Sequence, residues 1–184
     1  EAMLIARSDV PGAAAAEEIT LMAQACRDAG ADEVFTTDDA AEGEAFAAAR
    51  RMAIPAVERT GSLLLEDVGV PLPALPALVE GIAALAAEHD VTVAVIAHAG
   101  DGNTHPLIVY DPADDEMAVR AQAVFGKIMD LAIELGGTIT GEHGVGRLKK
   151  AWLPDQVGPD VMALTRQIKN ALDPRSILNP GVVL

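Results

Sequence analysis

The sequence contains few aromatic residues, few basic residues, one cysteine and no long hydrophobic run. Lys and Arg together number 13 against 28 acidic residues, and a formal net charge of −15 argues against a surface that binds nucleic acid or anionic lipid. Cys26 has no partner for an intrachain disulfide, which is typical of a reducing compartment. No apolar run approaches the ~20 residues of a transmembrane helix, and no secretory signal is visible. We therefore expect a cytoplasmic location, with any membrane association made through a partner.

The length and the apolar content indicate one well-packed domain. Of the 184 residues, 51% are apolar but only 3% are aromatic, so a core has to be built from Ala, Val, Leu and Ile. The chain starts inside an apolar stretch, residues 2–6, where a natural domain rarely begins. We therefore expect a single domain over residues 1–184 that belongs to a longer protein.

The hydrophobic periodicity predicts a mixture of strands and helices. Strands are expected at 2–7, 33–37, 61–70, 91–97, 105–109 and 138–140, and helices at about 13–29, 38–52, 74–89, 116–135 and 159–172. The connection between 91–97 and 105–109 is too short for a crossover, so these strands must pair as a hairpin. The predicted fold class is α+β, with a mostly antiparallel sheet covered by helices.

Two histidines flank the glycine-rich turn of this hairpin. His98 ends one strand and His105 enters the next, so both imidazoles should lie at one end of the sheet. Two histidines on a rigid hairpin form half of a typical site for Zn²⁺, Mn²⁺ or Fe²⁺. Gly100 and Gly102 would let the backbone turn and let a ligand approach closely. The alternative is that the histidines only terminate a hairpin.

A second glycine-rich segment, residues 141–146, contains Glu142 and His143. In extended backbone these adjacent side chains would diverge and do different jobs. Glu142 could complete a His-His-Glu ligand set that leaves coordination positions open, and His143 would be free as a general base or acid. The alternative is a solvated surface turn. His89, at a helix end, is expected to be exposed.

Three motifs in order make the sequence recognisable. The segments His98-Ala-Gly-Asp-Gly-Asn-Thr-His105, Gly141-Glu-His-Gly-Val-Gly146 and Leu178-Asn-Pro-Gly181 resemble the C-terminal domain of FAD-linked oxidases. This family includes glycolate oxidase FAD subunits, D-lactate dehydrogenases and D-2-hydroxyglutarate dehydrogenases, within the vanillyl-alcohol oxidase-like superfamily. Ala49–Arg51 and Asp67–Pro71 resemble two further family motifs. The resemblance covers essentially the whole chain and implies a ferredoxin-like cap domain.

The resemblance implies roles for five residues. His98, His105 and Glu142 would bind a divalent ion, which would hold the substrate's hydroxyl and carboxylate oxygens. His143 matches the base that takes the hydroxyl proton while hydride passes to the flavin. Arg50 matches an arginine that pairs with the substrate carboxylate, a role suited to its bidentate fork. The implied reaction is oxidation of a D-2-hydroxy acid to the 2-oxo acid.

The resemblance also implies how FAD is held. Asn103, Gly144 and Asn179 would lie on the flavin side of the site, whereas most of the FAD pocket would belong to an N-terminal domain that is not part of this chain. The glycine-rich loops do not form a Rossmann or P-loop pattern. The chain alone should therefore have little oxidoreductase activity, and its partners would be that FAD domain, the 2-hydroxy acid and an electron-acceptor subunit.

Three positions depart from the pattern of many relatives. Leu72 stands where a basic residue is common, Leu65 lies near the position of a lysine that helps bind a second carboxylate, and Val182 follows the Asn-Pro-Gly motif where lysine is common. The first two favour a monocarboxylate such as lactate or glycolate over 2-hydroxyglutarate. Val182 changes little.

Two other functions remain open at this stage. The chain could be a free-standing metal-dependent enzyme that uses the His98, His105 and Glu142 site without a flavin. It could also be a non-catalytic module whose acidic surface docks another subunit. An FAD-binding domain encoded directly upstream would argue against the first alternative. Loss of substrate-dependent flavin reduction on replacing His143 would argue against the second.

Overall fold

The computed structural model describes residues 2–184, which fall into two compact units divided between Ala56 and Val57. Each unit is described by itself. The single domain expected over residues 1–184 stays a prediction.

The first unit is helical. It contains α1 (Ala13–Asp28) and α2 (Ala40–Arg51), and α3 (Ala53–Glu58) includes the boundary between the units. Asp39 caps α2, because its carboxylate accepts hydrogen bonds from the amides of Ala41 and Glu42 at 2.7 and 2.9 Å. The strands expected at 2–7 and 33–37 are wrong, since neither segment is part of a strand. A strand needs a neighbour for its main-chain groups, and residues 2–56 contain no sheet that would supply one.

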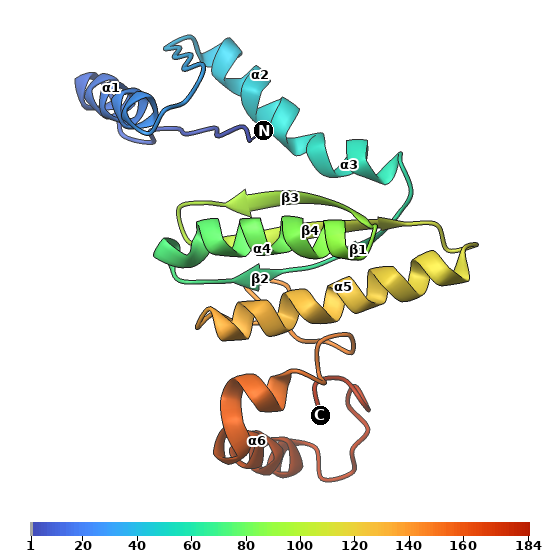
Figure 1. Ribbon diagram of the computed structural model, residues 1–184. Coiled ribbons are helices and arrows are strands. Elements are labelled where there is room, and N and C mark those ends of the chain that lie inside the picture. Colours follow the sequence, from blue (N-terminus) through green and yellow to red (C-terminus); the bar gives the residue numbers. More distant parts are fainter. Residues whose placement is uncertain (1) are drawn as a thin grey trace. The chain divides into compact units, whose positions relative to one another are not determined.

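The second unit contains an antiparallel sheet with β4 (Asn103–Tyr110) at its centre (Figure 1). β3 (Thr92–His98) pairs with one side of β4, and β1 (Ser62–Leu65) and β2 (Val68–Gly69) pair with the other. The predicted hairpin and the α+β class are confirmed. The sheet places the end of β3, the start of β4 and the start of β2 beside one another.

The strand expected at 61–70 is interrupted at Glu66 and Asp67, which separate β1 from β2. The segment expected as a strand at 138–140 contributes a single bridge, between Thr138 and Gly69. Both differences lie at the same end of the sheet. They leave Asp67 and the 138–146 segment outside the regular ladder, where their side chains and amides can contact one another.

Two helices cover one face of the sheet: α4 (Leu75–Glu88), which follows the short 3₁₀ helix η1 (Leu72–Ala74), and α5 (Asp115–Glu134). The buried core between these layers includes Val68, Leu78, Ile82, Ile108, Val124, Phe125, Ile128 and Met129. The helices predicted at 74–89 and 116–135 are confirmed as α4 and α5. Since strand side chains alternate, Ile108 faces the helices and His105 faces away from them.

The last helix, α6 (Leu153–Leu172), starts earlier than predicted. Gly158 breaks it with a φ of 77°, and Pro159 follows, so the predicted start near Pro159 corresponds to the second part. Among residues 2–184, no helix combines the length and the apolar character that crossing a bilayer requires.

The turn between β3 and β4 offers a matched pair of glycine substitutions. Gly102 has a φ of +79°, and a Cβ there would lie 2.1 Å from the carbonyl oxygen of Val70. The same glycine accepts a hydrogen bond from the Val70 amide at 3.1 Å. We expect Gly102→Ala to lower the free energy of unfolding by at least about 2 kcal/mol, because it combines strain with a backbone clash.

Gly100 is the control for this prediction. A Cβ at Gly100 meets no atom within 4 Å, so Gly100→Ala should change stability by less than about 0.5 kcal/mol. Urea unfolding of the two variants, followed by circular dichroism, measures both changes in the free energy of unfolding. Equal stability of the two variants would show that the turn does not have this geometry.

Candidate active site

The β3–β4 hairpin brings two histidines together. His98 pairs with Asn103 and Ile96 pairs with His105, so all four side chains lie on the sheet face opposite α4 and α5. The rings of His98 and His105 meet edge to face with centroids 5.4 Å apart. The expectation that the turn gathers both imidazoles at one end of the sheet is confirmed.

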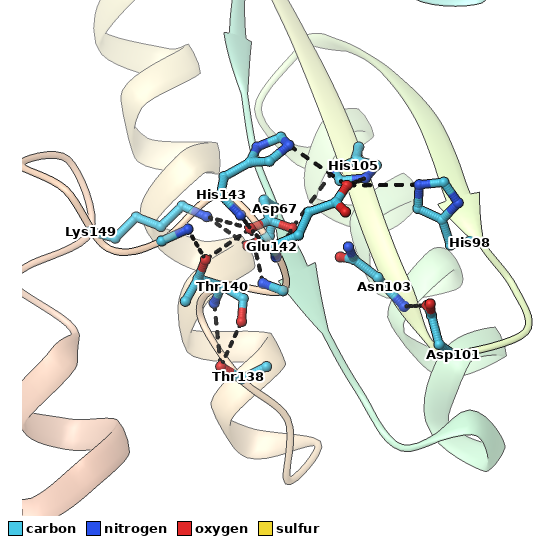
Figure 2. Close-up of polar contacts among 12 residues, drawn as sticks. Asp67, His98, Asp101, Asn103, His105, Thr138, Thr140, Glu142, His143 and Lys149 are labelled. Carbon is cyan, nitrogen blue, oxygen red and sulfur yellow. Dashed lines mark hydrogen bonds and ion pairs between the residues drawn. The ribbon is translucent and has the colours of Figure 1, made fainter. Parts of the chain in front are cut away.

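The Glu142 carboxylate lies at the centre of the histidine cluster (Figure 2). Its Oε1 atom is 3.4 Å from Nε2 of His105, 3.8 Å from Nε2 of His98 and 3.9 Å from Nε2 of His143. The His143 ring stacks on that of His105, with centroids 5.0 Å apart and an interplanar angle of 16°. Two segments about 40 residues apart in the sequence therefore meet at one carboxylate.

The expected divergence of Glu142 and His143 is wrong. It assumed extended backbone, whereas residues 141–143 bend around the carboxylate of Asp67. Its Oδ2 atom accepts hydrogen bonds from the amides of Gly141, Glu142 and His143 at 2.9, 3.1 and 2.8 Å, and from the Thr140 hydroxyl at 2.8 Å. With three successive amides turned to one anion, both side chains project toward the hairpin.

Burial and hydrogen bonding together set the protonation of the inner groups. The His105 side chain is 6% exposed, against 57% for Glu142. Burial lowers the pKa of His105, and the nearby Asp67 carboxylate only partly opposes this, so a neutral imidazole is favoured. Burial would raise the pKa of Asp67, but the hydrogen bonds from the His143 amide, Thr140 and Glu142, with the charge of Lys149, lower it to about 2.

Two further buried groups, Glu66 and Lys149, lie behind the site, and the sequence patterns did not single them out. Lys149 donates a 2.6 Å hydrogen bond to the carbonyl oxygen of Asp67. Burial raises the pKa of Glu66 to about 8, although the charge of Lys149 opposes the shift. Burial also lowers the pKa of Lys149. The one available signal was a pair of adjacent acids, Glu66 and Asp67, inside an otherwise apolar strand pattern.

The donor set of His98, His105 and Glu142 fits one divalent ion. One ligand atom from each lies within 4.8 Å of the others, and the two nitrogen–oxygen separations of 3.4 and 3.8 Å are within the span of two metal–ligand bonds of about 2 Å each. Two imidazoles and a carboxylate leave further coordination positions open, as catalytic sites do. These are the three residues predicted as ligands.

Two of the three residues predicted to lie near the flavin adjoin this cluster, since Asn103 pairs with His98 and Gly144 follows His143. The Oδ1 atom of Asn103 is buried and has no hydrogen-bond partner among the described residues, so it fits a polar group supplied from outside the chain. Gly141 makes room for it, since a Cβ there would lie 2.4 Å from that oxygen. Gly144 is exposed with a φ of 82° and open space around it.

Asn179 and Arg50 belong to other segments of the chain. Asn179, with a φ of 45°, is in the C-terminal tail, which returns to the second glycine-rich segment through a 2.9 Å hydrogen bond from the Val183 amide to the Gly146 carbonyl. Arg50 lies in the last turn of α2, within the first unit, and is half-buried there. His89, expected to be exposed, is partly buried at the end of α4.

Comparison with known proteins identifies the family. A family described as "FAD linked oxidases, C-terminal domain" matches residues 1–183. The glycolate oxidase subunit GlcD of Escherichia coli K12 is 43% identical over 154 residues, which cover 83% of this chain and 31% of that protein. GlcD of Bacillus subtilis is 36% identical over 182 residues, or 98% of this chain and 39% of that protein.

A mitochondrial "D-lactate dehydrogenase [cytochrome]" of Arabidopsis thaliana is also similar. It is 36% identical over 121 residues, which cover 66% of this chain and 21% of the plant protein. The chain thus matches between a fifth and two fifths of the length of these three relatives.

Proposed function

The chain belongs to the family of FAD-linked oxidase C-terminal domains, and from that membership we propose that it forms the substrate side of an FAD-dependent oxidoreductase. The reaction is oxidation of a small D-2-hydroxy acid, of the lactate or glycolate type, to the 2-oxo acid. Because the chain matches about a third of the two GlcD relatives, the rest of such a protein would hold most of the FAD.

The meeting of four side chains at one point is the observation that supports this proposal. His98, His105 and His143 each direct Nε2 to within 3.9 Å of one oxygen of Glu142. A structural role does not require such a group on the sheet face that α4 and α5 leave uncovered. A site that binds an ion and moves a proton does.

His98, His105 and Glu142 would hold a divalent ion, which when bound would orient the substrate's hydroxyl and carboxylate oxygens and lower the hydroxyl pKa. His143, half-exposed and stacked on His105, would accept the hydroxyl proton at Nε2. FAD, when bound, accepts the hydride that leaves the α-carbon. One proton and one hydride thus leave the substrate, as formation of a 2-oxo acid requires.

Four other residues belong to the proposed site. Arg50 would pair with the substrate carboxylate through its guanidinium group. Asn103, with its unpaired buried oxygen, would meet the substrate or the flavin edge, and Asn179 and Gly144 would lie on the flavin side. We extend the proposal to a cytoplasmic enzyme that passes electrons to an acceptor subunit.

Leu65 is the residue from which we infer that the substrate has a single carboxylate. Leu65 pairs with Leu107, two residues along β4 from His105, so its side chain lies on the same sheet face as the histidines. A leucine there offers no charge to a second carboxylate. Leu72, half-exposed in η1, does not offer one either. The proposal is therefore a monocarboxylate substrate.

The test compares kcat/KM for D-lactate, glycolate and D-2-hydroxyglutarate in the protein assembled with its FAD-binding domain. We expect the better monocarboxylate to exceed 2-hydroxyglutarate by at least about tenfold, the equivalent of one charge-assisted hydrogen bond. Leu65→Lys should reduce the difference in kcat/KM between the better monocarboxylate and 2-hydroxyglutarate. Leu63→Lys, on the same face but farther from His105, is the control.

The outcomes separate the parts of this proposal. Equal kcat/KM values for 2-hydroxyglutarate and lactate in the parent protein would refute the proposal of a monocarboxylate substrate. If no 2-hydroxy acid reduces the flavin of a protein with FAD bound, the proposed reaction is wrong.

A further inference from the structure

Asp67 is the buried residue that links both halves of the candidate site. It lies between β1 and β2 and is completely buried, and the four hydrogen-bond donors that converge on one of its oxygens favour the carboxylate anion. Buried charge is unfavourable unless it is well paired. What pairs with Asp67 therefore indicates what it does.

Its first set of partners is the loop that carries Glu142 and His143. One oxygen accepts four hydrogen bonds, from the amides of residues 141–143 and from the Thr140 hydroxyl, all between 2.8 and 3.1 Å. The Thr140 hydroxyl in turn accepts from the Gly144 amide at 2.8 Å, which closes the loop. The anion thereby determines the direction in which Glu142 and His143 project.

Its second partner is His105. The other oxygen, Oδ1, lies 3.8 Å from Nδ1 of His105, a nitrogen that is buried and makes no hydrogen bond among the described residues. The opposite nitrogen, Nε2, faces Glu142 at 3.4 Å. When an ion binds on the Nε2 side, the ring proton of His105 has to be on Nδ1, the nitrogen that the Asp67 carboxylate faces.

Asp67 is not well placed to serve as a ligand itself, although Asp67, His105 and His143 also form a cluster of possible ligand atoms. The lone pairs of its Oδ2 atom are already occupied by four donors. Its Oδ1 atom lies 3.3 Å from the Glu142 amide and faces the closed side of His105. The contacts of Asp67 therefore hold residues of the site in place and do not make it part of the ligand set.

We propose that Asp67 is a positioning residue, which fixes the 140–144 loop and the tautomer of His105 so that Glu142, His143 and His105 converge. This role rests on the proposed function, because it assigns Asp67 to the metal-binding and proton-transfer site. Its neighbour Glu66 is equally buried, but its side-chain oxygens accept no hydrogen bond from the residues that the structure describes, so it supplies a comparison.

The experiment compares Asp67→Asn with Glu66→Gln in the 184-residue chain. Both replacements keep side-chain size. Asp67→Asn removes the negative charge and turns one carboxylate oxygen into an NH2 group that cannot accept from the loop amides, whereas Glu66→Gln alters a buried carboxyl group that accepts no hydrogen bond from the described residues. Three quantities are measured at neutral pH. They are the affinity for Zn²⁺ by calorimetry, the His105 tautomer by long-range ¹H–¹⁵N NMR, and hydrogen exchange of the amides of residues 141–143.

For Asp67→Asn we expect a loss of Zn²⁺ affinity of about 10- to 100-fold, the usual effect of removing a group that orients a metal ligand. His105 should become a mixture of tautomers, and the three amides should exchange faster. Glu66→Gln should leave all three quantities as in the parent. A folded Asp67→Asn chain with the parent's affinity, tautomer and exchange rates would overturn the proposal.

A second variant keeps the proposal testable if Asp67→Asn does not fold. Thr140→Val removes one donor to Asp67 and the acceptor for Gly144, but keeps the charge. It should speed amide exchange in the loop and leave the His105 tautomer unchanged, and the absence of faster exchange would overturn the proposal. If the parent binds no Zn²⁺ but tautomer and exchange respond as expected, the metal assignment fails and the positioning role stands.

Discussion

His143→Ala is expected to slow substrate-dependent flavin reduction by about 10²- to 10⁴-fold, the usual contribution of a positioned general base. Its Nε2 atom is 3.9 Å from the Glu142 carboxylate, and its ring is held by stacking on His105. Because His143 is outside the predicted ligand set, the metal affinity of the chain should stay within about twofold of the parent's. The loss of rate should therefore appear in the transfer of the proton and the hydride, and not in metal binding.

The measurement is anaerobic stopped-flow reduction of the flavin by D-lactate or glycolate in the assembled enzyme. Zn²⁺ titration of the isolated chain serves as the control for the site's integrity. His143→Gln tests the same point with a larger side chain that cannot accept the proton. Flavin reduction at the parent rate in both variants would show that another group takes the proton.

His105→Ala should weaken binding of a divalent ion by more than about 100-fold, beyond the 10- to 100-fold effect of groups that only support ligands. His105 is the innermost of the three proposed ligands, with 6% of its side chain exposed, and burial lowers its pKa. At neutral pH it therefore offers a lone pair without first losing a proton. His98 and Glu142 alone are two half-exposed donors.

The control for this prediction is His89→Ala. His89 ends α4 and is not in either cluster of possible ligand atoms. Calorimetry should show much weaker binding of Zn²⁺ and Mn²⁺ to His105→Ala than to His89→Ala. If His105→Ala binds either ion as tightly as His89→Ala does, the three-residue ligand set is wrong.

Local rules were sufficient for the hairpin and most helices. The connection between His98 and His105 is too short for a crossover, which forces antiparallel pairing whatever surrounds it. The cap of α2 at Asp39 has a local cause of the same kind, whereas the first part of α6, from Leu153, was missed because the prediction started that helix near residue 159. The hairpin predicted that His98 and His105 lie at one end of the sheet, and their role as ligands was implied by the family resemblance; the register that puts both on one face is a finding of the structure.

Longer-range features were not predictable from pattern. Residues 2–7 have strand composition but no partner strand within residues 2–56, and a strand depends on its neighbour. The interruption at Asp67 could not be seen either, because its partners are amides of residues more than 70 positions later. Main-chain donors have no sequence signature, so the bend that brings Glu142 and His143 together was missed.

Metal depletion of the assembled enzyme tests the central claim most directly. We expect elemental analysis to find a divalent metal. Its removal by EDTA should slow anaerobic flavin reduction by D-lactate or glycolate at least about 100-fold, because a bound ion contributes several kcal/mol to such a step. Stoichiometric Zn²⁺ or Mn²⁺ should restore the rate. Undiminished flavin reduction in enzyme shown to contain no metal would contradict the assignment of His98, His105 and Glu142.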